Sequence, residues 1–333
     1  MYFQEKCSII KLTYLIIHRK SVFGKSHFGF CVYFAKMLTV LDAAKGRFAM
    51  YRILEKKKLN SFVTLMRIDA PQVAKKAEAG QFIILRVDEN GERIPLTVAD
   101  FDREAGSVTV IFQVVGATTE ALNRLEEGDS LHDFVGPLGR ATETEGLSKV
   151  AVVSGGVGCA IAYPVAKKLF ESGTEVHVVA GFRNRDLVIL EEEFERASTK
   201  LVRVSDDGSW GDKGLVTDAL RALIESGEQY DRVITIGPLP MMKFVCKLTR
   251  EFEIPTVVSM NPIMIDGTGM CGGCRLSVGG ETKFACVDGP EFDGHKVDFA
   301  ELMSRNSLYR GREAEVTETH ACRMEAMGKQ LIK

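Results

Sequence analysis

The sequence predicts an α/β plus all-β protein in three parts: an antiparallel β-barrel, a doubly wound parallel sheet and a small C-terminal domain. Short runs rich in Val, Ile, Thr and Phe, with one helical interruption, fill residues 50–147 and indicate the barrel. Strand-like and helix-like segments then alternate over residues 148–260, which is typical of a parallel sheet with right-handed crossovers. Residues 261–333 begin with a glycine-rich loop that carries cysteines and end in a charged tail, expected to be helical.

Length and composition are those of a globular protein with two or three domains. The chain has 333 residues, of which 45% are hydrophobic and 26% charged, and its net charge of −2 carries no nucleic-acid signature. The eight cysteines do not form a small disulfide framework. Because thiolates kept for metal binding need a reducing compartment, we expect a cytoplasmic protein. The apolar run at residues 8–17 is too short to span a bilayer.

Residues 1–49 differ from the rest of the chain. They hold eight Lys or Arg and two acidic residues, are rich in Phe and Tyr, and show no clear periodicity. One interpretation is a basic anchor at a membrane surface. We favour a non-structural or poorly ordered extension, from a start codon assigned too early, because Met50-Tyr-Arg-Ile-Leu begins an orderly pattern at once.

The barrel elements are recognised by β-branched and aromatic runs between turn residues. An Asn90-Gly91 pair between the second and third runs favours a tight hairpin. Gly136-Pro-Leu-Gly139 marks the end of the barrel. We expect strands at 61–68, 82–87, 94–100, 107–115 and 130–134, and a helix at 117–124.

The sheet elements alternate regularly, with apolar runs of strand length between amphipathic stretches of helix length. This alternation places each helix on a face of the sheet and each strand in its interior. We expect strands at 150–154, 175–181, 200–205, 232–236 and 256–260, and helices at 160–171, 190–197, 216–226 and 241–251.

Two barrel motifs are candidate flavin contacts. In Arg93-Ile-Pro-Leu-Thr97, a guanidinium suits a pyrophosphate, while a hydroxyl and backbone groups suit a flavin ring. An edge-strand proline beside a surface arginine is the ordinary explanation. Gly116-Ala-Thr-Thr119 opens the expected helix, whose N-terminus is a second candidate phosphate position.

A glycine-rich turn opens the doubly wound part. In Ser154-Gly-Gly-Val-Gly158, glycines let the backbone approach a phosphate, and the helix that follows favours negative charge. A tight turn without a ligand is the alternative. An acidic ribose ligand about 20 residues further on is absent, and Arg183 and Arg185 stand there instead. These arginines could bind the 2′-phosphate of NADP(H), or they could simply be exposed to solvent.

Two later loops follow expected strands, where doubly wound sheets place their ligands. They are Ser205-Asp-Asp-Gly208 and Gly237-Pro-Leu-Pro240, and both are equally compatible with ordinary turns. His177, in the middle of a strand, is expected to be structural.

The most informative segment is Asp266-Gly-Thr-Gly-Met-Cys271-Gly-Gly-Cys274, followed by Cys286. The plant-type 2Fe–2S pattern is C-x4-C-x2-C with a more distant fourth Cys. Asp266 stands at the first ligand position. Glycines without a Cβ allow the loop to wrap closely around a cluster. A zinc ribbon uses the same CxxC element, so the spacing leaves zinc open as an alternative.

The order of these motifs, with Gly-Pro-x-x-Met-Met at 237–242, resembles the ferredoxin–NADP reductase superfamily over residues 50–310. More narrowly, the chain is similar to two groups of electron-transfer subunits. One serves dihydroorotate dehydrogenase. The other comprises the small (alpha) subunits of NADH-dependent reduced ferredoxin:NADP oxidoreductases, also called sulfide dehydrogenase beta subunits. Relatives in the first group resemble a four-cysteine pattern, whereas relatives in the second group have Asp at the first ligand position. Asp266 therefore favours the second group.

The resemblance implies FAD on the barrel (50–147), NAD(H) or NADP(H) on the sheet (148–260) and a 2Fe–2S cluster in the C-terminal part (261–333). No side chain is expected to act as a catalytic acid or base. The implied FAD residues are Arg93, Pro95, Leu96, Thr97, Gly116 and Thr119. The implied nucleotide residues are Gly155, Gly156, Gly158, Asp206, Asp207 and Gly237. The implied cluster ligands are Asp266, Cys271, Cys274 and Cys286.

The implied function is that of an oxidoreductase subunit in a hetero-oligomer, with no nucleic-acid partner and no membrane span. NAD(P)H would give a hydride to FAD, and electrons would pass singly to the cluster and on to a partner. In the transhydrogenase-like version, the flavin would bifurcate electrons between NAD and ferredoxin. A large iron–sulfur flavoprotein subunit, like the small subunit of glutamate synthase, would handle NADP.

Two alternatives remain open at this point. The first is the electron-transfer subunit of an NAD-linked dihydroorotate dehydrogenase, which would contain the same parts. The second belongs to another class: a zinc-stabilised, nucleotide-binding regulator without a redox role.

Overall fold

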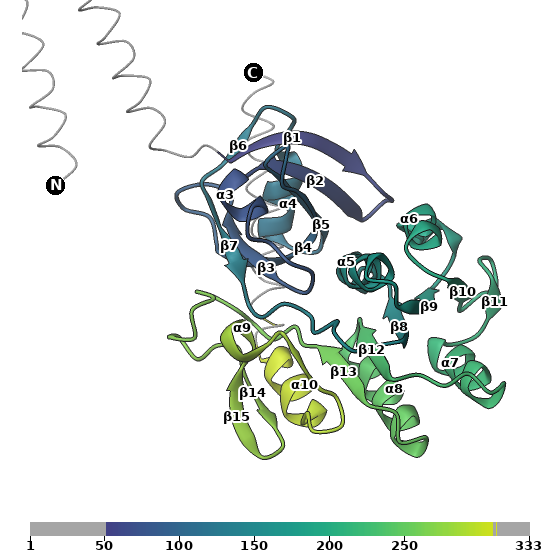
Figure 1. Ribbon diagram of the computed structural model, residues 1–333. Helices are drawn as coiled ribbons and strands as arrows, with labels where there is room; N and C mark the ends of the chain where they lie inside the picture. Colours follow the sequence, from purple (N-terminus) through teal and green to yellow (C-terminus); the bar gives the residue numbers. More distant parts are fainter. Residues whose placement is uncertain (1–50, 309–310, 312–333) are drawn as a thin grey trace, which may run out of the picture. The chain divides into compact units, whose positions relative to one another are not determined.

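A computed structural model describes residues 51–308 and 311 of the chain (Figure 1). The predicted extension at 1–49 and the end of the predicted tail, from residue 312 onward, lie outside the described residues. Within the described part, no helix is long and apolar enough to cross a membrane.

The N-terminal part is a seven-stranded antiparallel sheet in the spatial order β6-β1-β2-β5-β4-β3-β7. Its edge strands β6 and β7 are separated in sequence by a single residue, His132, so the two edges meet and the sheet curls into a nearly closed barrel. The predicted barrel is therefore confirmed. The strands are β1 (Tyr51–Lys58), β2 (Val63–Asp69), β3 (Phe82–Arg86), β4 (Ile94–Asp102), β5 (Ser107–Gln113), β6 (Ser130–Leu131) and β7 (Asp133–Leu138).

Strand β3 is buried on both of its faces. Ile83 and Leu85 belong to the barrel core, whereas Phe82 and Ile84 belong to a second apolar core outside the barrel. This division follows from the alternation of side chains along a strand. Two helices accompany the barrel strands: α3 (Pro71–Ala74) and α4 (Ala117–Arg124), which begins at the N-cap Gly116 as predicted.

The second sheet also has seven strands, in the order β11-β10-β9-β8-β12-β13-β16. All pairs are parallel except the last, which is antiparallel. The predicted doubly wound sheet is thus confirmed. Its strands are β8 (Lys149–Gly155), β9 (Glu175–Phe182), β10 (Lys200–Ser205), β11 (Asp212–Lys213), β12 (Arg232–Ile236), β13 (Thr256–Ser259) and β16 (Glu291–Asp293).

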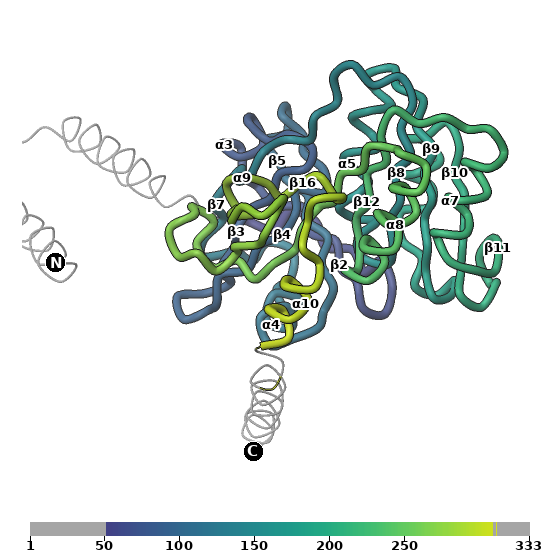
Figure 2. The backbone as a smooth tube through the Cα atoms, turned by 90° about the horizontal axis from the view of Figure 1, so that it is seen from below, coloured from purple at the N-terminus to yellow at the C-terminus, as the bar shows by residue number. Residues whose placement is uncertain are grey.

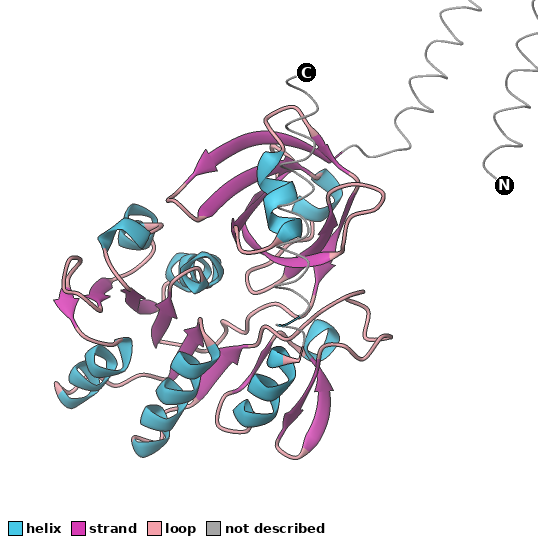
Figure 3. Cartoon of the chain, turned by 180° about the vertical axis from the view of Figure 1, so that it is seen from behind, coloured by secondary structure: helices cyan, strands magenta, loops and turns pink. Residues whose placement is uncertain are grey.

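Helices cover both faces of this sheet (Figure 3). One face packs on α5 (Gly158–Glu171) and α6 (Glu191–Arg196), and the other on α7 (Val216–Glu225) and α8 (Leu239–Glu251). A short 3₁₀ turn, η1 (Arg185–Leu187), follows β9. The chain order reverses between β8 and β12, which makes that point the topological switch where such sheets bind ligands.

The C-terminal part contains a hairpin of β14 (Arg275–Val278) and β15 (Glu281–Phe284), then α9 (Ala285–Asp288) and α10 (Phe299–Ser307). Asp298 caps α10 by accepting a hydrogen bond from the Glu301 amide. Figure 2 shows α9 beside the barrel strands β3 and β7. Strand β16 joins this part to the large sheet by pairing with β13.

The prediction of one strand over 130–134 is wrong. The chain forms two strands there, because the His132 amide donates to the Arg86 and Val87 carbonyls, where the chain crosses from one barrel edge to the other. Several short elements were not predicted: α3, β1, β11, β14, β15, α9 and β16.

Polar contacts tie the three parts together. The Lys167 ammonium of α5 lies 2.9 Å and 3.2 Å from the two carboxylate oxygens of Asp100 on β4. The Thr142 hydroxyl, in the segment between barrel and sheet, donates to the Glu291 carboxylate of β16 at 2.6 Å. Burial raises the pKa of Glu291 to about 7, although the Thr142 hydrogen bond and the Arg232 charge act in the opposite direction.

The raised pKa of Glu291 gives a prediction for stability against pH. The folded protein holds this proton more tightly than an unfolded glutamate does, so stability is lost as pH rises from about 4.5 to 7. We expect Glu291→Gln to melt like the wild type at pH 5. At pH 8 it should melt higher, by on the order of 2 kcal/mol or roughly 4–8 °C.

Thermal melting of the holoprotein at both pH values checks this expectation. Glu104→Gln is the control, because its side chain is exposed and is not among the charges that act on Glu291. If the melting temperatures of Glu291→Gln and the wild type differ by the same amount at pH 5 and at pH 8, the prediction is wrong.

Candidate functional site

One cavity of about 1420 Å³ is lined by the barrel, the parallel sheet and the segment 259–264 that leads to the cysteine loop. The barrel contributes side chains from β3, β4 and β5 and from the start of α4. The sheet contributes the loops that follow β8, β9, β10 and β12, on both sides of the switch point. The cavity thus lies where both predicted nucleotide-binding motifs converge.

On the barrel side, Pro95, Leu96, Thr97 and Thr119 line the cavity. Arg93 does not itself line the cavity; it stands just before β4, and its Nε atom is buried without a hydrogen-bond partner in the described part of the chain. A buried guanidinium nitrogen without a partner is costly. Phosphate oxygens are the partners that a guanidinium fits best, so Arg93 fits the pyrophosphate of a flavin nucleotide.

Gly116 does not line the cavity but caps helix α4 beside it. The Thr119 hydroxyl accepts hydrogen bonds from the amides of Val115 and Gly116 at 3.0 Å and 3.1 Å. These contacts hold the loop before α4 in place at the barrel end of the cavity. The two residues therefore shape the phosphate position that the sequence predicts.

On the sheet side, Gly155, Gly156, Gly158 and Gly237 all line the cavity. Gly156 has φ +56°, and a Cβ placed on it would lie more than 4 Å from the neighbouring atoms. A Cβ on Gly158 would lie 2.6 Å from the Ile236 carbonyl oxygen. These glycines therefore let β8, α5 and β12 meet at the switch point, with the N-terminus of α5 facing a phosphate position.

The structure separates the two acidic residues predicted beside the nucleotide. Asp206 lines the cavity, and so does Arg183 from the loop after β9. Asp207 does not line it, because its carboxylate accepts hydrogen bonds from the amide and hydroxyl of Ser209. Those contacts lower the pKa of Asp207, the Ser209 hydroxyl most of all. Asp207 is thus placed to shape its own turn.

Two of the four predicted cluster ligands are buried next to each other. The Sγ atoms of Cys274 and Cys286 lie 3.2 Å apart as free thiols, and both side chains are almost fully buried. Burial, with the hydrogen bond from Cys274, raises the pKa of Cys286 to about 12. A bound metal ion deprotonates a thiol that coordinates it, so such a pair suits a metal more than an ordinary core.

The other two predicted ligands form a second pair at the surface. The Asp266 carboxylate accepts hydrogen bonds from the amides of Thr268 and Cys271, at 2.9 Å and 3.1 Å. The Thr268 bond, followed by those from Cys271, lowers the pKa of Asp266. The exposed Cys271 thiol accepts a hydrogen bond from the Gly273 amide at 3.4 Å. Ligands in two separate pairs fit a cluster of two iron atoms.

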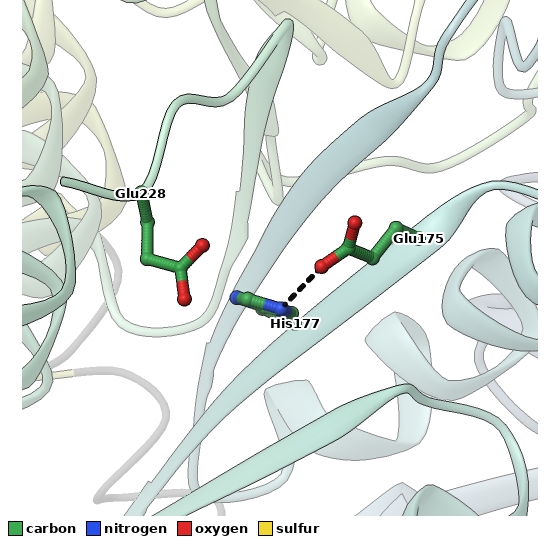
Figure 4. A group of neighbouring side chains, drawn as sticks. All are labelled: Glu175, His177 and Glu228. Carbon is green, nitrogen blue, oxygen red and sulfur yellow. Dashed lines mark hydrogen bonds and ion pairs between the residues drawn. The ribbon is translucent and has the colours of Figure 1, made fainter.

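A different group of possible metal ligands lies at the amino ends of the parallel strands, away from the cavity (Figure 4). Glu175, His177 and Glu228 converge within 4.8 Å, and they are the one such group in the part of the chain described. The Lys149 ammonium contacts both carboxylates, so a cation is already present. His177 is buried and bonds to Tyr230 and Glu175. This group is structural, as predicted for His177.

Sequence reasoning missed the segment between the sheet and the cysteine loop. Met260 and Met264 line the cavity and also pack in the apolar core that contains Cys274 and Cys286. Phe82 of β3 does the same. The one signal for these residues in the sequence is their position, since segment 259–264 leads from the last parallel strand, β13, to Asp266.

Comparison with known proteins agrees with this geometry. Residues 261–298 match the iron–sulfur cluster binding domain of dihydroorotate dehydrogenase B, and residues 152–247 match the oxidoreductase NAD-binding domain. The zinc alternative is therefore set aside in favour of an iron–sulfur cluster.

Similar proteins cover most of the described chain. A Thermotoga maritima homologue of the electron transfer subunit of dihydroorotate dehydrogenase B (NAD(+)) is 48% identical over 268 residues, 80% of this chain and 94% of its own. The subunit of that name from Fusobacterium nucleatum is 30% identical over 242 residues, 70% of this chain and 92% of its own.

Among solved structures, one of an NADH-dependent reduced ferredoxin-NADP oxidoreductase, studied for flavin-based electron bifurcation, is 46% identical. It has a TM-score of 0.78 and covers 81% of this chain and 98% of its own. The chain therefore belongs to the family of dihydroorotate dehydrogenase B electron-transfer subunits and their homologues, iron–sulfur oxidoreductases with a ferredoxin reductase-like fold.

Proposed function

We propose that this chain moves electrons from a nicotinamide nucleotide through FAD and a 2Fe–2S cluster to a partner subunit. The observation that carries the proposal is the single cavity between the flavin strand β4 and the glycine turn after β8, with the cysteine loop behind its wall. Bound there, FAD supplies the conversion of a two-electron hydride into single electrons, and the cluster supplies one-electron transfer.

Within this proposal, the chain's own residues bind and orient. Arg93 holds the FAD pyrophosphate, and the strand residues Pro95–Thr97 place the flavin ring at the barrel side of the cavity. Gly155–Gly158 and the α5 N-terminus hold the nucleotide phosphates. Asp206 and Gly237 complete the nucleotide side, while Asp207 shapes the turn. The domain division that we predict (50–147, 148–260 and 261–333) assigns one cofactor to each part.

The face around the cysteine loop suits a partner protein. Ile265 and Met270 are 54% and 88% exposed, and Val287 is 39% exposed. Val287 lies beside the loop, because a Cβ on Gly269 would be 3.1 Å from its Cγ2. Exposed apolar side chains gathered at one place mark protein interaction sites. We place a large iron–sulfur flavoprotein subunit there, with ferredoxin as a further partner, in a cytoplasmic hetero-oligomer.

We favour the ferredoxin:NADP oxidoreductase type over the dihydroorotate type. Identity is 46% to the solved ferredoxin-NADP oxidoreductase chain and 30–36% to six curated dihydroorotate subunits, whereas the Thermotoga maritima homologue of those subunits reaches 48%. Asp266 in place of a first cysteine points to the ferredoxin:NADP oxidoreductase type. A co-purifying subunit that oxidises dihydroorotate would decide for the second type.

Anaerobic purification with native partners tests the proposed function. We expect a coloured protein whose flavin absorbance is bleached by NADH or NADPH, with an EPR signal of a reduced 2Fe–2S cluster. A colourless protein without flavin or iron would overturn the proposal.

Arg93 gives a prediction for flavin affinity. Arg93→Met keeps an unbranched apolar stem but removes the guanidinium donors, and hydrogen bonds to charged groups contribute about 1.5–3 kcal/mol. We expect the FAD dissociation constant to rise by roughly 10- to 100-fold, measured by fluorescence titration of flavin-free protein. Arg103→Met, on the barrel surface beside Glu78, is the control. Unchanged FAD affinity in Arg93→Met would rule out the assigned role.

Asp266 gives a prediction that separates a ligand from a loop cap. Asp266→Asn keeps an oxygen that accepts from the Thr268 amide but lacks the anionic donor, whereas Asp266→Cys supplies a thiolate. If Asp266 binds iron, Asp266→Asn loses iron, and Asp266→Cys retains it with a shifted reduction potential. If Asp266 only caps the loop, Asp266→Asn keeps its iron and the potential of Asp266→Cys is unchanged. Iron analysis and a redox titration followed by EPR distinguish the two.

A further inference from the structure

Gly267, the residue after Asp266, lies where the cysteine loop meets the barrel. Its φ is +76°, and a Cβ built there would lie 2.7 Å from Leu138 Cδ1 and 2.8 Å from Ile84 Cδ1. Both distances are shorter than real Cβ contacts. The loop backbone therefore packs directly on side chains of β3 and β7, and an added Cβ would have to displace the ends of both. Ile84 is fully buried, so its end has less room to move than a surface side chain would have.

Ile84 connects this contact to the flavin strand. In the β3–β4 pairing, Ile84 stands opposite Pro95 and Phe82 stands opposite Thr97. Residues paired across two strands share one face of the sheet, and neighbouring strands are about 4.7–4.9 Å apart. Pro95 and Thr97 therefore lie on the same outer face of the barrel as Phe82 and as Ile84, against which the loop packs.

The space between the two sites is filled by apolar side chains. Phe82, Met260 and Met264 are each at most 9% exposed, line the cofactor cavity, and belong to the core that contains Cys274 and Cys286. These three side chains therefore belong both to the cavity lining and to the cysteine core, and the seating of the loop on β3 affects how far apart the two sites lie.

We propose that Gly267 is a positioning residue that sets the separation between the flavin and the iron–sulfur cluster, through its contact with Ile84. The inference rests on the proposed function. Because electron transfer through protein falls off exponentially with distance, a loop lifted off β3 slows transfer from flavin to cluster. The hydride step, on the opposite side of the cavity, is left unchanged.

The test variant is Gly267→Ala, and Gly280→Ala is its matched control. Gly280 has φ +82°, close to that of Gly267, but its Cβ would meet no atom within 4 Å. Both variants carry the same backbone strain, and only Gly267→Ala adds crowding. Ile84→Val removes the Cδ1 atom that crowds Gly267, so Gly267→Ala/Ile84→Val is the rescue variant, while the Leu138 side-chain end can turn aside.

Stopped-flow absorbance after mixing with NADH or NADPH measures flavin reduction and cluster reduction separately. In Gly267→Ala we expect flavin reduction at the wild-type rate. Cluster reduction should be several-fold slower, because the rate of electron tunnelling falls exponentially with the added distance. Gly280→Ala should behave like the wild type, and the double variant should recover most of the rate. A Gly267→Ala rate equal to that of Gly280→Ala would overturn the proposal.

A second readout needs no bound cluster. The amides of Thr268 and Cys271 donate to the Asp266 carboxylate beside Gly267, so their hydrogen exchange reports how well this loop is ordered. Hydrogen exchange at these amides should be faster in Gly267→Ala, and restored in the double variant. Unchanged exchange would contradict the contact even if Gly267→Ala lost its cluster. A wild type whose cluster is not reduced at all would refute the proposed function, and the exchange data would still decide the role of Gly267.

Discussion

Strand β3 is shared between the barrel core and the core of the cysteine domain, and the arrangement of the binding sites depends on this double burial. Ile83 and Leu85 pack into the barrel, so Phe82 and Ile84 must face outward, toward the cysteine loop. An outward face this apolar has to be covered, because exposing it to water would cost stability. The loop backbone covers it at Gly267, which brings the predicted iron site to the wall of the flavin site.

The parallel sheet adds the predicted nucleotide site, which opens into the same cavity as the flavin site. Its order reverses between β8 and β12, and the glycine turn after β8 opens into the cavity that β4 lines. Segment 259–264 then leads from the last parallel strand along the cavity to the cysteine loop. The order of sites in space therefore matches the order in which electrons are proposed to move: nucleotide, flavin, cluster. The exposed end of the cluster loop faces outward, where a partner can dock.

Local patterns in the sequence were enough to predict the large elements and most candidate site residues. Helix α4 and strand β12 have the predicted bounds, because propensity and pattern agree there with the tertiary fold. Strand β16 could not be predicted, since Glu291–Asp293 is three residues long and is a strand only because it pairs with β13. Met260 and Met264 gave no signal beyond their position before Asp266, because their role depends on which two sites the folded chain places around them.

We propose that flavin and cluster occupy two sides of one wall made by Phe82, Met260 and Met264. Anomalous diffraction at the iron edge, from crystals of the holoprotein, tests this most directly. We expect two iron atoms at Asp266, Cys271, Cys274 and Cys286, and flavin density against Pro95 and Thr97 on the cavity side of the wall. Iron located elsewhere, or a single zinc atom in the loop, would contradict it.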